Sequence, residues 1–186
     1  AVEQKKEDAP HCLIKKILQT SLMFPKNNKC ITYAKKYIKD YPNSPRVLTV
    51  CASALAEAED IAQAHEAFKK AVALKPENRR VQHDYAKFLL QKVDFDDAIQ
   101  VYTQLISETP NNQTLLEEVF KAYIEKGQLE NALSYQKKLY ELAPGNVNNA
   151  GLLLFSYYLL NEETKASALL ETLKTILPPF FYHMLA

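Results

Sequence analysis

The chain has very little glycine and no tryptophan. Only three of its 186 residues are glycine, against an average of about 7% in proteins. This scarcity argues against a β-rich fold with many tight turns. It also excludes glycine-rich phosphate-binding loops, because Gly127, Gly145 and Gly151 are too far apart to build one.

Long apolar runs and paired cysteines are also absent. No run of about 18 apolar residues occurs, so the sequence predicts no membrane-spanning helix. Cys12, Cys30 and Cys51 are odd in number and have no CxxC spacing, which fits neither a disulfide framework nor a zinc site. Free thiols favour a reducing compartment, and we expect a cytoplasmic location. The chain begins at Ala1 without a methionine, so a removed targeting segment would be invisible.

The sequence offers no catalytic constellation. Its four histidines form no HExxH or equivalent ligand pair. Cys30 and Cys51 fall at apolar helix positions, which predicts two buried core thiols. Glu117 and Lys121 are i, i+4 partners, a spacing typical of a solvated helix face. We therefore expect no enzyme, no metal and no cofactor.

Proline, in contrast, is strictly placed. Five of the nine prolines stand 34 residues apart: Pro42, Pro76, Pro110, Pro144 and Pro178. A fixed period of this length is the signature of a repeat array. With each proline at position 32, the repeats span 11–44, 45–78, 79–112, 113–146 and 147–180.

Each repeat shows two amphipathic helical stripes. In 45–78, apolar residues recur at i, i+3, i+4 and i+7, first at Leu48, Cys51, Ala52 and Leu55 and then at Ala64, Ala67, Phe68 and Ala71. We call these five evenly spaced prolines the ladder prolines. Each should stop the second helix of its repeat, because it lacks an N–H and pushes the preceding residue out of the α region. Two residues later an N-capping asparagine follows in three repeats: Asn78, Asn112 and Asn146. Asp96 is expected to cap the second helix of the third repeat.

The pattern of a small residue, an aromatic residue and the proline resembles the tetratricopeptide repeat. It is met by Ala64-Phe68-Pro76 and by Ala98-Tyr102-Pro110. The resemblance covers about 170 residues and implies an all-α, right-handed solenoid of helix-turn-helix repeats. We expect a single domain over 11–180, with an N-terminal tail at 1–10 and a tail or a further helix at 181–186.

In tetratricopeptide arrays, the first helix of each repeat lines a concave groove. Carried over to this sequence, the resemblance implies polar groove residues in four repeats and largely apolar ones in the fifth. The implied residues are Lys15, Lys16, Gln19 and Met23; Arg46, Thr49, Ser53 and Glu57; Arg80, His83, Asp84 and Lys87; Thr114, Glu117, Glu118, Lys121 and Glu125; and Asn148, Leu152, Phe155, Tyr158 and Leu159.

The charge along this implied groove is uneven. Residues 11–44 carry seven lysines and one acid, giving +6, and the rest of the chain sums to −5. We hypothesise that a partner peptide lies in one direction, with its acidic part towards the first repeat and its apolar part towards the fifth. Charge reversal at Lys15, Lys16 and Arg46 should then weaken binding more at low salt than at high salt.

Two specialised functions of similar repeats fit poorly. The carboxylate clamp of co-chaperones would fall on Lys15, Gln19, Val50, Arg80 and Asp84 in the first three repeats, and Asp84 would repel a carboxylate. Repeats that bind RNA need a basic lining along the array, whereas four of the five repeats each sum to −1. We therefore expect no nucleic-acid partner and no clamp.

The C-terminal end is apolar. Residues 151–160 are apolar almost all round, and an apolar tail follows at 177–185. Three explanations stay open: the tail folds back as a cap, a further repeat is missing, or the end is an interface, including a homodimer interface.

The sequence thus predicts a scaffold or adaptor that binds a protein or peptide in its groove. The alternative is the repeat region of a larger enzyme or of a secretion or assembly complex.

Overall fold

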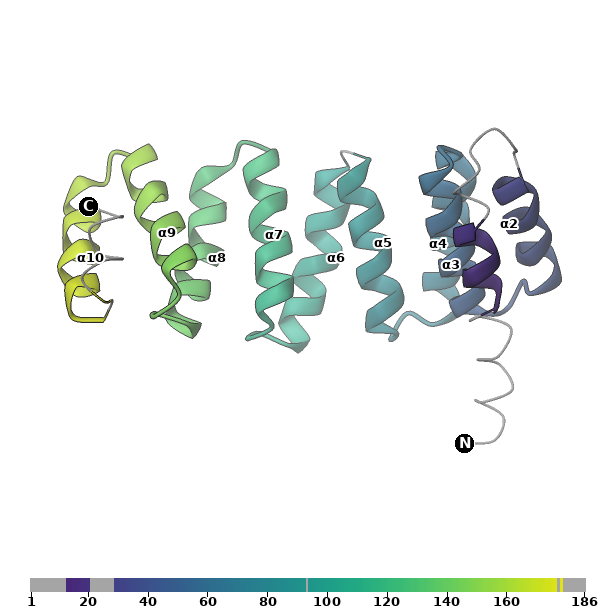
Figure 1. Cartoon of the computed structure of the whole chain (residues 1–186), viewed down its shortest axis with the longest axis horizontal. Helices are drawn as coiled ribbons and strands as arrows, with labels where there is room; N and C mark the ends of the chain where they lie inside the picture. Colours follow the sequence, from purple (N-terminus) through teal and green to yellow (C-terminus); the bar gives the residue numbers. More distant parts are fainter. Residues whose placement is uncertain (1–12, 21–28, 93, 177, 179–186) are drawn as a thin grey trace. The chain divides into compact units, whose positions relative to one another are not determined.

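The structure, a computed structural model, describes residues 13–20, 29–92, 94–176 and 178. Helices are the only regular elements in these ranges, and residues 13–20 are also helical. The labelled helices, drawn in Figure 1, are α2 (Lys29–Asp40), α3 (Pro45–Glu57), α4 (Ile61–Leu74), α5 (Arg79–Gln91), α6 (Phe95–Glu108), α7 (Gln113–Glu125), α8 (Leu129–Leu142), α9 (Val147–Leu159) and α10 (Glu163–Ile176).

Contacts divide the chain into two compact units, Ala1–Val93 and Asp94–Ala186. We call them the N-terminal unit and the C-terminal unit. The division falls between α5 and α6, inside the third 34-residue repeat. The expected single domain over 11–180 stays a prediction, and the tails at 1–10 and 181–186 lie outside the described residues.

The N-terminal unit is built around α3. This helix packs against α2, α4 and α5, and Leu48 and Leu55 on it are fully buried. Aromatic rings join α4 to α5, with 5.0 Å between the ring centroids of Phe68 and Phe88. His65 Nε2 lies 2.9 Å from the Tyr85 hydroxyl beside them. The apolar stripes read from the repeat at 45–78 are thus its core.

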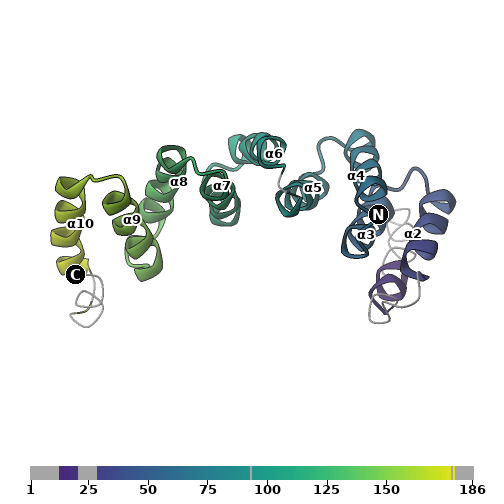
Figure 2. The same cartoon turned by 90° about the horizontal axis from the view of Figure 1, so that it is seen from above.

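The C-terminal unit is a run of neighbouring helices from α6 to α10 (Figure 2). Its best-defined core cluster joins α8, α9 and α10, and it includes Leu133, Leu154 and Leu173. A polar link supports the same contact, because the buried Gln136 donates through Nε2 to the carbonyl oxygen of Asn149 over 2.9 Å.

The ladder prolines end helices as the sequence predicts. Helices α4, α6 and α8 each end two residues before a proline. The residue before the proline has left the α region in all three cases, with ψ of 76° at Lys75, 71° at Thr109 and 71° at Ala143. This is the restriction that a proline ring places on its predecessor.

The three predicted asparagine caps are confirmed, and the predicted aspartate cap is wrong. Asn78, Asn112 and Asn146 accept backbone N–H bonds at the starts of α5, α7 and α9. Asp96, however, lies inside the first turn of α6, and Asp94 occupies the N-cap position without a side-chain bond. The carboxylate of Asp96 instead pairs with Lys126, next to α7. An acid in the first turn still favours the helix through its dipole.

One backbone position, the fifteenth of the repeat, is left-handed wherever it is described in the last four repeats. Glu59, Gly127 and Asn161 have φ of 64°, 75° and 55° after α3, α7 and α9. At Gly127 the chain closes a Schellman motif, in which the Gln128 N–H donates to the Tyr123 carbonyl over 2.9 Å. The equivalent Val93 lies outside the described residues.

Candidate functional site

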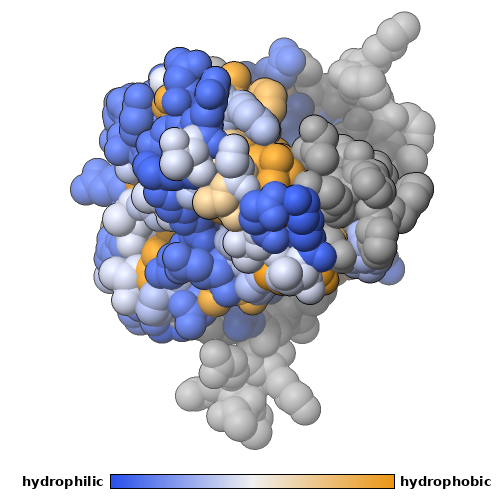
Figure 3. Space-filling view, turned by 90° about the vertical axis from the view of Figure 1, so that its left-hand side faces the viewer, coloured by the Kyte–Doolittle hydropathy of each residue, from blue (hydrophilic) through white to orange (hydrophobic). Residues whose placement is uncertain are grey.

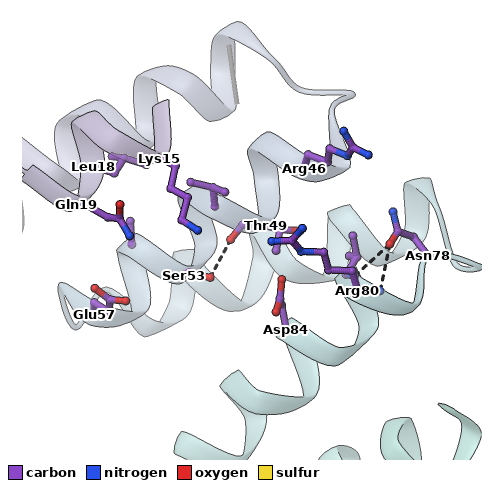
Figure 4. Close-up of a pocket in the computed structure, with 13 residues that line it drawn as sticks. Lys15, Leu18, Gln19, Arg46, Thr49, Ser53, Glu57, Asn78, Arg80 and Asp84 are labelled. Atoms are coloured by element: carbon purple, nitrogen blue, oxygen red, sulfur yellow. Dashed lines mark hydrogen bonds between the residues drawn. The ribbon is translucent and has the colours of Figure 1, made fainter. Parts of the chain in front are cut away.

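The N-terminal unit contains a groove of about 740 Å³. Side chains from residues 13–20, α3 and α5 line it, as Figure 4 shows. These segments are the first helices of three consecutive repeats, which is where the resemblance places a groove. We call this feature the N-terminal groove.

The floor of the N-terminal groove is one face of α3. Arg46, Thr49, Ser53 and Glu57 recur at intervals of three or four residues, so they share a side of the helix. The Thr49 hydroxyl donates to the Pro45 carbonyl over 2.8 Å, and the Ser53 hydroxyl donates to the Thr49 carbonyl over 3.1 Å. Their donors are thus used internally, while their oxygens can still accept hydrogen bonds from a ligand.

Charges of both signs line the groove. Lys15, Arg46 and Arg80 supply positive charge, and Glu57 and Asp84 supply negative charge. His83 Nδ1 lies 3.9 Å from an oxygen of Asp84. The groove can therefore bind groups of either sign, at different places.

Eight of the twelve implied groove residues of the first three repeats line this groove: Lys15, Gln19, Arg46, Thr49, Ser53, Glu57, Arg80 and Asp84. Lys16, His83 and Lys87 are on the same helices but do not line it. The twelfth, Met23, lies outside the described residues. That the eight residues bind a partner stays a prediction.

Sequence reasoning missed some lining residues. Leu18, Ala54, Asn78 and Val81 also border the groove. Leu18, Ala54 and Val81 are buried apolar residues, and no sequence motif distinguishes them from other core residues. The sequence predicts Asn78 only as a helix cap. It borders the groove because it lies at the start of α5, which lines one side.

The implied residues of the C-terminal unit lie on α7 and α9. Glu117, Glu118 and Lys121 belong to α7, and Asn148, Leu152 and Phe155 belong to α9. Thr114 and Glu125 on α7 are exposed. That these residues bind a partner stays a prediction.

Helix α9 has one buried side and one exposed apolar side. Leu152, Phe155, Tyr158 and Leu159 are 45%, 58%, 49% and 48% exposed. These four residues are the apolar positions of α9 that the resemblance places in the groove, where side chains are open to solvent. Seen from the α10 end, the described surface is mostly hydrophilic with scattered hydrophobic residues (Figure 3). The apolar tail lies almost wholly outside the described residues.

The two cysteines that the structure describes lie in the core. Cys30 and Cys51 are buried on α2 and α3, as the sequence predicts. Burial raises the pKa of Cys51 to about 12, and it also raises the pKa of Cys30. A reactive cysteine needs a lowered pKa, so neither thiol is suited to nucleophilic chemistry.

Two searches of the described ranges bear on other functions. No group of three or more His, Cys, Asp or Glu residues in them could hold a metal ion. No helix in the same ranges is long and apolar enough to cross a membrane.

Solved structures show the same fold over most of the chain. MamA from Desulfovibrio magneticus RS-1, residues 41 to the end, has a TM-score of 0.66 and 20% identity, with 90% of this chain and 95% of that chain covered. Pseudomonas aeruginosa pilF has a TM-score of 0.65 and 18% identity, with 89% and 76% covered. Identities this low show the fold alone. No curated protein matches the sequence.

A family model also matches the sequence. The model of the cytochrome c-type biogenesis protein H TPR domain matches residues 49–150, which is more than half of the chain. The match runs from α3 to α9. The chain therefore belongs to this family of tetratricopeptide repeat proteins, and its fold is an all-α helical repeat solenoid.

Proposed function

We propose that the protein is an interaction scaffold that binds a peptide segment of a protein partner in the N-terminal groove. The observation that carries the proposal is the groove itself, lined by charged and polar side chains from three successive first helices. Ligand sites are concave and combine apolar walls with a few polar groups that fix orientation. Leu18, Val50 and Val81 are the apolar wall here, and Thr49 and Ser53 are among the polar groups.

Two neighbouring lysines provide a matched test. Lys15 lines the groove and Lys16 does not, although they belong to the same helical segment and both are exposed. The protein is immobilised and used to capture partners from an extract of its own organism, in native, Lys15→Glu and Lys16→Glu forms. Captured proteins are identified by mass spectrometry. We expect Lys15→Glu to weaken capture of the specific partner at least fivefold and Lys16→Glu to leave it near the native level.

Ionic strength separates charge from packing in this test. An exposed charge contributes more at low salt, since the Debye length shrinks from about 30 Å at 0.01 M to about 8 Å at 0.15 M. The loss caused by Lys15→Glu should therefore be larger at 0.01 M than at 0.15 M. Equal losses for the two variants would contradict binding in the groove.

We further propose that this scaffold acts in the biogenesis of c-type cytochromes. The support is the family, whose model is described as a domain of a cytochrome c-type biogenesis protein. The same description favours the alternative in which these repeats serve an assembly complex over the alternative of an enzyme subunit. Members of a scaffold family of this kind typically carry no chemistry of their own, so the proposal assigns no reaction to this chain.

The cytochrome proposal is tested in cells. Covalent haem in c-type cytochromes survives denaturation, so haem staining of a denaturing gel reports their maturation. A strain without this gene should lose stained c-type cytochromes. The native gene should restore them, the Lys16→Glu gene should do so equally well, and the Lys15→Glu gene should restore less. Unchanged staining in the deletion strain would refute the cytochrome role while leaving peptide binding to the capture experiment.

A further inference from the structure

The charges of the N-terminal groove are ordered along its length. Arg46 is in the first turn of α3, and Glu57 is the last residue of that helix. Figure 4 shows Arg46 and Asn78 at one end of the groove and Glu57 with Gln19 at the other, while Lys15 and Arg80 reach towards Thr49. The half of the groove where α3 and α5 begin contains Arg46, Arg80 and Asp84 and is positive on balance. Lys15 lies between this half and Glu57, which marks the opposite end (Figure 4).

From this order we propose that the groove selects an extended peptide segment with an acidic side chain near one end and a basic side chain about four residues away. The acidic side chain lies beside Lys15, Arg46 and Arg80, and the basic side chain lies beside Glu57. This inference rests on the proposed function and specifies its ligand. It also differs from recognition of a chain-terminal carboxylate, because both recognised charges belong to side chains within the segment. Asp84 lies in the same lining as the three basic residues, which outnumber it, so the net charge offered to the acidic side chain is still positive.

The length of the segment follows from helix geometry. Arg46 and Glu57 are eleven residues apart on α3, and a helix rises about 1.5 Å per residue, so their backbones are about 16 Å apart. An extended chain advances about 3.3 Å per residue. Four such steps, from the first to the fifth residue of a segment, cover about 13 Å. The two charged side chains at its ends therefore need to reach only a few ångströms further to meet Arg46 and Glu57.

The volume of the groove is close to that of a five-residue extended segment. An extended chain needs a cross-section of about 4.8 Å by 10 Å, so five residues fill about 800 Å³. A helix about 10 Å wide and 16 Å long occupies about 1,300 Å³. The groove holds about 740 Å³, which matches the extended form.

The hydroxyl groups of the floor suit the backbone of such a segment. Thr49 and Ser53 donate their own hydrogens to α3 carbonyls, so each hydroxyl oxygen is left as an acceptor. An extended peptide has unpaired N–H groups that need acceptors. The floor thus supplies backbone acceptors between the two charged ends.

The charge order is tested with a set of blocked, fluorescein-labelled pentapeptides whose middle residues are valine, threonine and valine. Their end residues are aspartate and lysine, two aspartates, or two lysines. Fluorescence anisotropy at 0.02 M salt measures the dissociation constant of each for the native protein. We expect the mixed-charge peptide to bind at least fivefold more tightly than either like-charged peptide. A fourth peptide, with the aspartate and lysine adjacent, should bind as weakly as the like-charged ones.

Reversal of the Glu57 charge should change which peptide binds most tightly. In Glu57→Lys, the doubly acidic peptide should become the tightest ligand and the mixed peptide should weaken at least fivefold. The matched control is Glu66→Lys, an exposed residue of α4 that does not line the groove, and it should keep the native order. Circular dichroism verifies that both variants fold.

The outcomes distinguish this inference from the function on which it rests. Equal binding of all peptides, or an unchanged order in Glu57→Lys, overturns the charge order, even if Lys15→Glu still reduces capture of the natural partner. If Lys15→Glu and Lys16→Glu capture the partner equally, the proposed function fails instead. Tighter binding of the doubly acidic peptide to the native protein would also overturn the inference, because it would show that Glu57 plays no part.

Discussion

At the scale of single residues, the left-handed turn positions show how the repeat tolerates different side chains. Glycine adopts positive φ without steric cost, asparagine does so with little cost, and other residues pay about 1–2 kcal/mol. Glu59 has φ of 64° at a position where Gly127 has 75°. Its strain is held in place by the Schellman hydrogen bond from the Asp60 N–H to the Leu55 carbonyl, 2.9 Å long.

Replacement of this glutamate should therefore stabilise the protein. We expect Glu59→Gly to raise the free energy of unfolding by about 0.5–1 kcal/mol, because relief of strain exceeds the added freedom of the unfolded chain. Gly127→Ala is the matched control at the equivalent position, and it should lower stability by about 1 kcal/mol. Urea unfolding followed by circular dichroism measures both. A loss of stability in Glu59→Gly would show that the turn is not strained.

The buried thiol of Cys51 predicts a pH dependence. Its pKa is about 12 in the folded protein against an ordinary value of 9.0. Below pH 9 both states are protonated, so the thiol costs no stability there. Between pH 9 and about 12 only the unfolded state loses the proton, and stability should fall by up to about 1.4 kcal/mol per pH unit.

The comparison with Cys51→Ala isolates this effect. Other groups titrate in the same range, so the quantity measured is the difference in unfolding free energy between native protein and variant at pH 8 and at pH 10. The native protein should lose about 1 kcal/mol more than the variant over this interval. An identical decline in both would mean that the folded thiol ionises freely.

At the scale of helices, asparagine N-caps fix where the first helix of three repeats begins. Asn112 accepts a hydrogen bond from the Leu115 N–H over 3.3 Å at the start of α7. The loss of a cap costs about 1 kcal/mol. We expect Asn112→Ala to lower the free energy of unfolding by this amount, whereas the neighbouring, exposed Asn111→Ala should change it by less than about 0.5 kcal/mol. Denaturant titration measures the free energy of unfolding of both variants. Equal losses in the two would show that the Asn112 cap does not stabilise α7.

Helix boundaries could be predicted because their causes are local. A proline lacks an N–H and restricts the residue before it, and an asparagine accepts hydrogen bonds from N–H groups two or three residues ahead. Asp96 shows where this reasoning fails. Aspartate is favoured both at the N-cap and in the first turn, and Asp94, two residues earlier, occupies the N-cap position instead. The ion pair of Asp96 with Lys126, thirty residues away in sequence, could not be inferred from local rules.

At the scale of the whole molecule, repeat arrays are stabilised mainly by contacts between neighbouring repeats, so a core mutation should lower stability mainly near its own position. Leu55 is fully buried in the N-terminal unit, and Leu139 is 2% exposed in the C-terminal unit. Truncation of a buried leucine to alanine costs about 2–5 kcal/mol. We expect Leu55→Ala to raise hydrogen exchange mainly in α2, α3 and α4, and Leu139→Ala to raise it mainly in α7, α8 and α9.

Hydrogen–deuterium exchange with mass spectrometry resolves the two patterns by peptide. The variants are controls for each other, since each removes the same atoms from a different unit. Equal loss of protection across α2–α10 in both variants would mean that the chain unfolds as one cooperative block, and it would contradict a nearest-neighbour array.

The repeat length and most helix ends could be read from the sequence, because short-range rules set them and the 34-residue period repeats those rules five times. The resemblance to the tetratricopeptide repeat supplied the candidate groove positions, since equivalent positions of equivalent helices face the same way. The packed structure was needed to show that Lys15 lines a groove while Lys16 does not, and that Leu18 and Val81 border it. These outcomes depend on how far each helix is rotated against its neighbours, and that rotation is set by packing between residues distant in the chain.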